Sequence, residues 1–455
     1  MVYDLIILGG GPAGYLAAER AGHAGLSVLL FEERTVGGVC LNEGCIPTKT
    51  LLYSAKLFDS ARHGEKYGVK AENLSIDHAA VVRRKDKVVK VVVSGVKSSL
   101  KASGAVVLSQ RARISGKGPD GYTVSGEGET YTGKRLLIAT GSSPAVPPIP
   151  GLKEGMASGT VLTNREILDL KERPDRLCVI GGGIIGLEMA SYFCSIGAQV
   201  TVIEMLDHIA GENDRDLIKL LQADFEKRGI VFELSAKVTA IDKNSVHYEE
   251  NGQSLALQAD KVLLSIGRRP NTADLGLESI GIYVERGAIV TDGHMQTNQP
   301  DVYAAGDVNG ISMLAHTAYR EAEVAVNRML GKQDTMRYDA IPSVLYTNPE
   351  LASVGETEAS AKAKGLPCKT ISLSMRFSGR YVAENEGGNG MLKMVVNEKT
   401  RQILGMQALC NYASEFIIAA GTYVELGLTL DEIKKIVFPH PTVCEIMREA
   451  VFQYE

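Results

Sequence analysis

Two cysteines separated by four residues are the side chains in this sequence best suited to chemistry. Cys40 and Cys45 lie in the segment Gly-Gly-Val-Cys-Leu-Asn-Glu-Gly-Cys-Ile-Pro-Thr-Lys, which ends at Lys49. Across a five-residue step a regular helix separates Cα atoms by roughly 8–9 Å, whereas a disulfide needs about 4.4–6.8 Å. A disulfide between them therefore requires a distorted helix. Gly44 and Pro47 are the positions where this distortion could be accommodated. Because a strained disulfide is easily reduced, the pair predicts redox catalysis.

A metal site is the competing interpretation of the same cysteines. Tetrahedral zinc needs four ligands, or three and a water, and no second Cys or His pair follows at ligand spacing, so no metal is expected. Lys49 lies four residues after Cys45 and would share its helix face, where a cation could stabilise a thiolate. Without further context it could equally be an ordinary surface lysine. Cys178 and Cys194 fall in apolar segments and are expected to be small core residues.

An apolar strand, a glycine motif and a helix open the chain. The strand covers residues 3–8, the glycines are Gly9, Gly11 and Gly14, and the next strand ends in Glu32. In this pattern the first glycine permits the turn, the second lets a dinucleotide pyrophosphate approach, and the third allows helix and strand to pack closely. The pyrophosphate binds at the helix N-terminus, and the acid accepts hydrogen bonds from the ribose hydroxyls. The segment therefore predicts a dinucleotide site.

The same pattern returns in the middle of the chain. A strand over residues 176–180 leads into Gly181, Gly183 and Gly186, and the next strand ends in Glu204. In both copies the acid follows the last glycine by 18 residues. One glycine motif is weak evidence, but two that each join a buried strand to a helix and end at an acid are strong. Two dinucleotides are expected, although either glycine set could be merely a tight turn.

The segments around the second copy divide the chain into domains. A proline-rich stretch at 142–151 and Arg-Arg-Pro-Asn at 268–271 are typical of linkers. The second nucleotide unit is therefore expected to be inserted in the first, in an α/β fold with two Rossmann-like domains and a separate C-terminal domain. The expected boundaries are 1–145 and 268–335 for the first nucleotide domain, 146–267 for the second, and 336–455 for the C-terminal domain.

Composition narrows the function classes. The 455 residues include 49 Lys and Arg against 54 Asp and Glu, so no nucleic-acid footprint is expected. A basic run at residues 83–101 is interrupted by valines and favours the solvated face of an amphipathic helix. The N-terminus carries Asp4 and lacks the basic region of a signal peptide, and no segment has the roughly 18 apolar residues of a membrane span. Seven cysteines do not indicate a secreted disulfide framework, so a cytoplasmic protein is expected.

These motifs resemble the pyridine nucleotide–disulfide oxidoreductase family along essentially the whole chain. The segment from Gly37 to Lys49 resembles the active-site signature of its dihydrolipoamide dehydrogenases. The resemblance implies that FAD binds the first nucleotide domain and NAD the second. It also implies that Cys45 faces the flavin as a thiolate, and that Cys40 exchanges with the substrate disulfide. Lys49 would lie near the reactive edge of the flavin, paired with Glu188.

The C-terminal segment Phe-Pro-His-Pro-Thr-Val-Cys-Glu also matches the family. By resemblance, His440 is the acid–base for the dithiol and is oriented by Glu445. An imidazole can take a thiol proton at neutral pH, and only the thiolate attacks. In the family this histidine comes from the other subunit, so the C-terminal domain is expected to be an α+β dimerisation domain of a homodimer. Cys444 and Glu43 depart from the usual family residues, and their effect is left open.

Two sets of candidate residues follow. The catalytic set is Cys40, Cys45, Lys49, His440 and Glu445. The cofactor-binding set is Gly9, Gly11, Gly14, Glu32, Lys49, Thr140, Gly141, Gly181, Gly183, Gly186, Glu188, Glu204, Gly267, Gly306 and Asp307, in which Asp307 would bind the ribityl chain of FAD.

The resemblance implies an enzyme that oxidises protein-bound dihydrolipoamide through the Cys40–Cys45 disulfide and FAD and reduces NAD⁺. Its partner would be a lipoyl-bearing protein of a 2-oxoacid dehydrogenase or glycine-cleavage system. A glutathione-type reductase of the same family is an alternative, but Glu204 disfavours NADPH because a carboxylate repels the 2′-phosphate. A redox-inert structural subunit is a second alternative, which the complete catalytic set disfavours.

Overall fold

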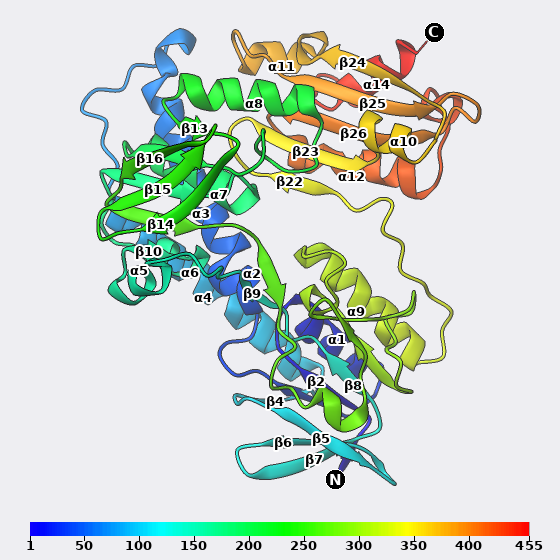
Figure 1. The fold of residues 1–455 in the computed structure, drawn as a ribbon. Coiled ribbons are helices and arrows are strands. Elements are labelled where there is room, and N and C mark those ends of the chain that lie inside the picture. Colours follow the sequence, from blue (N-terminus) through cyan, green and yellow to red (C-terminus); the bar gives the residue numbers. More distant parts are fainter. Residues whose placement is uncertain (455) are drawn as a thin grey trace. The chain divides into compact units, whose positions relative to one another are not determined.

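Residues 1–454, which the computed structural model describes, form two units (Figure 1). The first unit contains Met1–Thr50, Ala80–Val146 and Gly267–Arg337, and the second contains Leu51–Ala79, Pro147–Ile266 and the chain from Tyr338 onward. The segment that carries the second glycine motif thus lies outside the first unit and interrupts it, as the linker-like stretches suggest. The domain boundaries given above remain predictions.

A parallel five-stranded sheet forms the centre of the first unit. Its order is β21-β8-β2-β3-β4 and every neighbouring pair is parallel. The strands are short apolar runs, and all except the edge strand β4 are buried on both faces, which is typical of parallel sheets. They are β21 (Val302–Ala304), β8 (Leu136–Ile138), β2 (Leu5–Leu8), β3 (Val28–Phe31) and β4 (Val106–Leu108).

Helices and an antiparallel meander complete the first unit. Helices α1 (Pro12–His23) and α9 (Ala315–Met329) lie side by side, and α4 (His78–Ala102) leads into β4 (Figure 1). Apolar side chains of the meander share one core with the parallel sheet. The meander consists of β5 (Arg113–Gly118), β6 (Gly121–Gly126) and β7 (Glu129–Gly133), and β1 (Val2–Tyr3) pairs in parallel with β7, which gives a sheet of order β1-β7-β6-β5. Two small ribbons join β9 (Ser142–Pro144) to β18 (Arg268–Pro270), and β19 (Val284–Glu285) to β20 (Ala288–Ile289).

The second unit repeats this arrangement around the second glycine motif. Its parallel sheet has the order β10-β17-β11-β12-β13, with the motif-bearing strand again central, and α7 (Ile184–Ser195) has the same 12-residue length as α1. The strands are β10 (Val161–Leu162), β17 (Lys261–Leu264), β11 (Arg176–Ile180), β12 (Gln199–Ile203) and β13 (Val231–Glu233). A three-stranded meander follows β13 just as one follows β4, with β14 (Ala236–Ile241), β15 (Ser245–Glu250) and β16 (Gln253–Gln258). The repeat therefore extends from the glycine motif to the sheet order.

An antiparallel sheet forms the C-terminal part of the second unit (Figure 1). Its order is β22-β23-β26-β25-β24, and α12 (Ala413–Glu425) and α14 (Glu445–Phe452) share its main apolar core. Lys393 of β25 lies on the opposite face and pairs with Asp214 and Asp216 at the start of α8 (Arg215–Lys227). The strands are β22 (Ser343–Leu345), β23 (Glu350–Gly355), β24 (Cys368–Ser374), β25 (Met391–Asn397) and β26 (Ile403–Cys410).

No helix within residues 1–454 is long and apolar enough to cross a membrane. Shorter helices and 3-10 turns connect the elements described above. They are α5 (Leu152–Ser158), α6 (Asn164–Leu168), α10 (Glu358–Ala363), α11 (Gly379–Glu384), α13 (Leu430–Ile433), and the 3-10 turns η1 (Gly64–Tyr67), η2 (Leu277–Ile280), η3 (Asp307–Asn309) and η4 (Met375–Phe377).

Candidate active site

The two cysteines lie on either side of a helix break. Helix α2 (Gly38–Glu43) carries Cys40, and α3 (Cys45–Arg62) begins at Cys45. Between them Gly44 adopts φ −144° and ψ −105°, which no helical residue does. The distortion expected from the disulfide geometry is therefore present, and it is at Gly44. Pro47 lies in the first turn of α3, where its missing N–H costs no helical hydrogen bond.

The cysteine pair is electrostatically set for one thiol to ionise before the other. A hydrogen bond with the Cys45 thiol and burial both raise the pKa of Cys40 well above its usual range, and the charge of Lys49 opposes them only in part. Only a thiolate attacks a disulfide. Cys40 therefore needs an external base to react, whereas the proton it retains can stabilise a charge on Cys45.

A pair of tyrosines lies near the cysteines in the first unit. The hydroxyls of Tyr15 on α1 and Tyr319 on α9 are 2.5 Å apart, and the rings meet edge to face. Burial raises the pKa of both phenols, and both lie close enough to Cys40 for the charge of its thiolate to act on them. The sequence gives no signal for this pair because its members are 304 residues apart.

The first glycine motif forms a cradle that admits no side chain. Gly9 has φ +101°, and a Cβ there would lie 2.3 Å from the carbonyl oxygen of Ala139. A Cβ on Gly14 would lie 1.8 Å from the carbonyl oxygen of Gly9, so helix and strand touch through their backbones. Gly11 caps α1 without any side-chain hydrogen bond, which leaves N–H groups of the first turn to a ligand.

The acid at the end of β3 is held by two backbone groups. Glu32 accepts hydrogen bonds from the N–H of Gly10 at 2.8 Å and from that of Arg34 at 2.8 Å. Its carboxylate is thereby fixed beside the glycine motif, where a ribose would lie. This part of the first unit fits the adenosine diphosphate portion of a dinucleotide.

The second glycine motif reproduces these contacts. A Cβ on Gly181 (φ +103°) would lie 2.3 Å from the carbonyl oxygen of Ser265, and Gly183 caps α7 without a side-chain hydrogen bond. Gly186 would place a Cβ 2.2 Å from the carbonyl oxygen of Gly181. Glu204 accepts from the N–H groups of Gly182 at 2.6 Å and Leu206 at 2.8 Å. The second unit thus fits a second dinucleotide, bound in the same way.

A buried acid supports the loop that carries Asp307. Glu321 on α9 is fully buried and accepts a hydrogen bond from the N–H of Gly306 at 2.6 Å. The Asp307 carboxylate accepts from the hydroxyl of Ser142 at 2.5 Å. Next to it, the buried side-chain N–H₂ group of Asn309 makes no hydrogen bond within residues 1–454, so a donor is available for a ligand. No sequence motif indicates Glu321; an acid on the alanine-rich buried face of a helix is the signal that could have revealed it.

The other predicted flavin-side residues lie in the same unit. Thr140 donates its hydroxyl to the carbonyl of Asn271 at 2.7 Å, and the Asn271 amide donates to the Thr140 carbonyl at 2.9 Å. Gly141 accepts from the N–H of Asn271, and Gly267 accepts from that of Ala145 at 3.0 Å. These bonds fix the two strands through which the chain leaves and re-enters the first unit.

His440 and Glu445 form a hydrogen-bonded pair in the second unit. Nδ1 of His440 lies 2.9 Å from Oε1 of Glu445, and Oε2 accepts from the N–H of Thr442 at 2.7 Å. Burial raises the pKa of Glu445, but the bonds from Thr442 and His440 outweigh it, so the net pKa is lowered. The carboxylate therefore stays charged and orients an imidazole whose side chain is 80% exposed. This imidazole can offer Nε2 to a group outside its own unit.

Comparison with known proteins agrees with this geometry. The model of the pyridine nucleotide-disulphide oxidoreductases matches residues 3–322, and the model of their dimerisation domain matches residues 341–451. The chain belongs to the pyridine nucleotide-disulphide oxidoreductase family. The predictions of the family, of an α/β oxidoreductase fold, and of FAD and NAD as cofactors are thereby confirmed. The second match assigns the C-terminal sheet to the part of the family fold that forms the homodimer.

Individual relatives of this oxidoreductase are similar over their full lengths. A dihydrolipoyl dehydrogenase of Mycoplasma pneumoniae is 38% identical over 99% of this chain and 98% of its own, and one of Geobacillus stearothermophilus is 36% identical over 98% and 95%. Among solved structures, LpdA of Mycobacterium tuberculosis has a TM-score of 0.90 at 26% identity, with 99% of each chain covered. The flavoprotein disulfide reductase RclA of Escherichia coli has a TM-score of 0.87 at 28% identity and full coverage of both chains.

Three residues of this oxidoreductase have local contacts that bear on their predicted roles. Glu188 on α7 is buried and accepts from the N–H of Tyr346 at 3.0 Å; because Lys49 belongs to the other unit, their pairing remains a prediction. Glu43 forms an ion pair with Arg34, so its charge near the cysteines is largely compensated. The sulfur of Cys444 lies 3.2 Å from the hydroxyl of Thr442.

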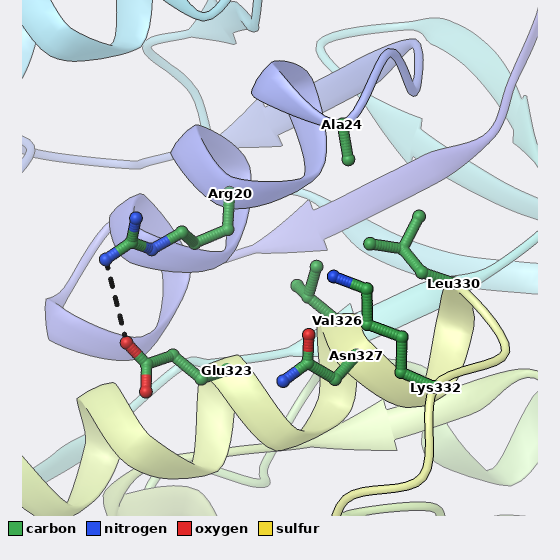
Figure 2. A pocket seen from close by; sticks show the side chains of 7 residues that line it. All are labelled: Arg20, Ala24, Glu323, Val326, Asn327, Leu330 and Lys332. Carbon is green, nitrogen blue, oxygen red and sulfur yellow. Dashed lines mark ion pairs between the residues drawn. The ribbon is translucent and has the colours of Figure 1, made fainter.

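Neither a metal cluster nor a pocket between α1 and α9 competes with this site within residues 1–454. Within residues 1–454, no three His, Cys, Asp or Glu side chains gather as metal ligands. A pocket of about 240 Å³ lies between α1 and α9 and is bridged by Arg20 and Glu323, whose charged groups are 3.7 Å apart (Figure 2). It includes Ala24 just beyond the C-terminal end of α1, whereas a pyrophosphate binds at the N-terminal end.

Proposed function

We propose that this protein oxidises dihydrolipoamide to lipoamide and transfers the electrons through FAD to NAD⁺. The observation that carries the proposal is the cysteine pair on either side of the break at Gly44, hydrogen-bonded to each other beside Lys49. Full-length relatives that bear the name dihydrolipoyl dehydrogenase support the choice of substrate within the family.

The first step is a thiol–disulfide exchange that needs a base. One dihydrolipoamide thiol gives its proton to Nε2 of His440 of the partner subunit and attacks the sulfur of Cys40, which breaks the Cys40–Cys45 bond and releases Cys45 as a thiolate. The second substrate thiol then attacks the first substrate sulfur and displaces Cys40, which takes up the proton of this thiol, so the substrate leaves as a cyclic disulfide while both cysteines are reduced. The raised pKa of Cys40 favours its departure as a protonated thiol and leaves the charge on Cys45. When bound, FAD would supply the two-electron transfer from this dithiol to NAD⁺, by which the disulfide would be restored.

The remaining candidate residues receive binding roles in the proposal. FAD would be held by the first glycine motif together with Glu32, Gly306 and Asp307. NAD would be held by the second glycine motif together with Glu204. Lys49 would lie at the flavin and pair with Glu188. The carboxylate of Glu204 suits the two ribose hydroxyls of NAD and would repel the additional phosphate of NADP.

The physiological electron donor would be a lipoyl group on a partner protein of a 2-oxoacid dehydrogenase or glycine-cleavage system. The active form would be the homodimer, since each cysteine pair needs a histidine from the other subunit. The cytoplasm is the compartment expected for such a partnership, and it remains a prediction.

A substrate comparison on the purified flavoprotein tests the proposal. Dihydrolipoamide and glutathione would each be assayed with NAD⁺ and with NADP⁺, for the unmodified protein, Cys45→Ser and the control Cys368→Ser. We expect turnover with dihydrolipoamide and NAD⁺, its loss in Cys45→Ser, and its retention in Cys368→Ser, because Cys368 lies on β24 outside the candidate site. Faster turnover with glutathione and NADP⁺ would instead establish the glutathione-type alternative. A protein without flavin would establish an inert subunit.

A further inference from the structure

Five cationic side chains follow one side of α4. Arg83, Lys87, Lys90, Lys97 and Lys101 are all exposed, and we call them the basic stripe. At about 100° per residue they fall within an arc of about 80°, and at about 1.5 Å per residue the stripe is about 27 Å long. The opposite side of the helix carries the buried apolar residues. The helix is therefore amphipathic, as expected, but its polar side is of one sign.

The charge of α4 stands out against the rest of the protein. The helix contains seven Lys or Arg and one Asp, which gives it a net charge of +6. The whole chain has a net charge of −5, so the residues outside α4 together carry −11. Its one acid, Asp86, pairs with Lys85 at 2.7 Å. The four lysines of the basic stripe make no ion pair with any side chain among residues 1–454.

This pattern is unfavourable for the helix itself. Arg83 and Lys87, and Lys97 and Lys101, are four residues apart, and Lys87 and Lys90 are three apart, spacings at which like charges repel. A solvated helix face would be more stable with acids interspersed. The uncompensated charge therefore requires another explanation than the stability of α4.

The N-terminal end of the basic stripe adjoins α3, the helix that begins at Cys45. Arg84, next to Arg83 in the chain, donates from Nη1 to the carbonyl oxygen of Thr50 at 3.1 Å. Thr50 lies on α3, five residues beyond Cys45. A molecule bound along α4 would therefore be held close to the segment where the exchange reaction takes place.

We propose that the basic stripe docks an acidic face of the lipoyl-bearing partner protein and so raises the local concentration of its lipoyl group. This role rests on the proposed function. Charge complementarity between patches mainly accelerates encounter and fixes orientation. A lipid surface is disfavoured, because the apolar side of α4 is buried in the protein and only Val91 is strongly exposed beside the stripe.

Charge reversal separates docking from chemistry. The triple variant Lys87→Glu, Lys90→Glu, Lys97→Glu would be compared with a control of equal charge change, Lys237→Glu, Lys243→Glu, Lys399→Glu, whose lysines are exposed elsewhere. Each would be assayed with free dihydrolipoamide and with a reduced lipoyl domain of net negative charge. We expect the stripe variant to lose about tenfold in kcat/KM for the lipoyl domain at low ionic strength, and less than about twofold for free dihydrolipoamide. At about 0.5 M salt the difference should largely vanish, because screening shortens the range of charge interactions.

The possible results distinguish this inference from the proposed function. If kcat/KM for the lipoyl domain fell equally in the stripe and control variants, or in neither, the docking role would be overturned. Turnover of free dihydrolipoamide would in that case still support the proposed reaction. If the stripe variant lost binding to anionic phospholipid vesicles but kept its kcat/KM for the lipoyl domain, the docking role would be overturned. The basic stripe would then bind a lipid surface. No turnover of free dihydrolipoamide by the unmodified protein would refute the proposed function, and the docking role with it.

Discussion

Replacing Glu321 should weaken FAD binding although this residue lies behind the proposed site. Its carboxylate is fully buried and accepts the hydrogen bond from the N–H of Gly306, which precedes Asp307. Leucine has a similar size but no acceptor, so Glu321→Leu leaves a buried N–H unpaired at a cost of about 1–3 kcal/mol. The loop can relax when FAD is absent but must be ordered when FAD binds, so the cost should fall on affinity. At tenfold per 1.4 kcal/mol, FAD should bind about 5- to 150-fold more weakly.

Two variants on the same helix make this prediction specific. Glu321→Gln keeps an acceptor and should bind FAD within about threefold of the unmodified protein, a difference below about 1 kcal/mol. Glu323→Leu removes a carboxylate that is 36% exposed and pairs with Arg20 and Arg320 at 3.7 and 3.8 Å; it should leave FAD affinity unchanged, since exposed ion pairs contribute little. Affinity would be measured by the recovery of flavin fluorescence on dilution. If Glu321→Leu retained FAD as tightly as Glu323→Leu, the supporting role of Glu321 would be refuted.

Three further changes test other parts of the structure. Gly38→Ala should reduce both FAD content and turnover, because a Cβ on Gly38 (φ +57°) would lie 2.6 Å from the Cα of Gly11; normal flavin content would contradict this. Burial lowers the pKa of His78, which bonds the Tyr192 hydroxyl at 2.8 Å, so the unfolded chain takes up a proton first as the pH falls below about 6.5. The melting temperature should therefore drop on acidification from about pH 7 to pH 5, and by less in His78→Gln; equal drops would refute it. Glu204→Ala should raise kcat/KM for NADP⁺ relative to NAD⁺ by about tenfold or more, and an unchanged ratio would show that Glu204 does not discriminate.

Features that depend on neighbours in the chain could be predicted from the sequence. Gly14 and Gly186 are required by contacts with the carbonyl oxygens of Gly9 and Gly181 in their own strand-to-helix turns, so the pattern alone indicated two nucleotide units. The break at Gly44 followed from the Cα separation of two cysteines five residues apart. The bond between His440 and Glu445 lies within one short segment and was expected from the resemblance.

Features that depend on residues distant in the chain could not be predicted. The contact of Tyr15 with Tyr319 arises only when α9 packs beside α1, and that of Glu321 with Gly306 arises only when α9 folds back on the loop after β21. Glu43 was recognised as a charge near the cysteines, but its partner Arg34 was not, because either residue could have faced solvent. The basic stripe was visible as a periodic pattern. That its four lysines make no ion pair within residues 1–454 could be learned only from what surrounds the helix.

The ribbon of β9 and β18 also describes how this chain could have been assembled. Pro144 pairs with Arg268, and Ser142 with Pro270, so the polypeptide departs from and returns to the first unit along adjacent antiparallel strands. In an ordinary hairpin two to five residues would join such strands; here the whole of residues 145–267 takes the place of that turn. Since the entropy of closing a loop grows only slowly with its length, a complete nucleotide-binding module can occupy this position without disturbing the host sheet. Pro144 and Arg268 are accordingly natural splice points for exchanging one pyridine-nucleotide module for another of different coenzyme preference.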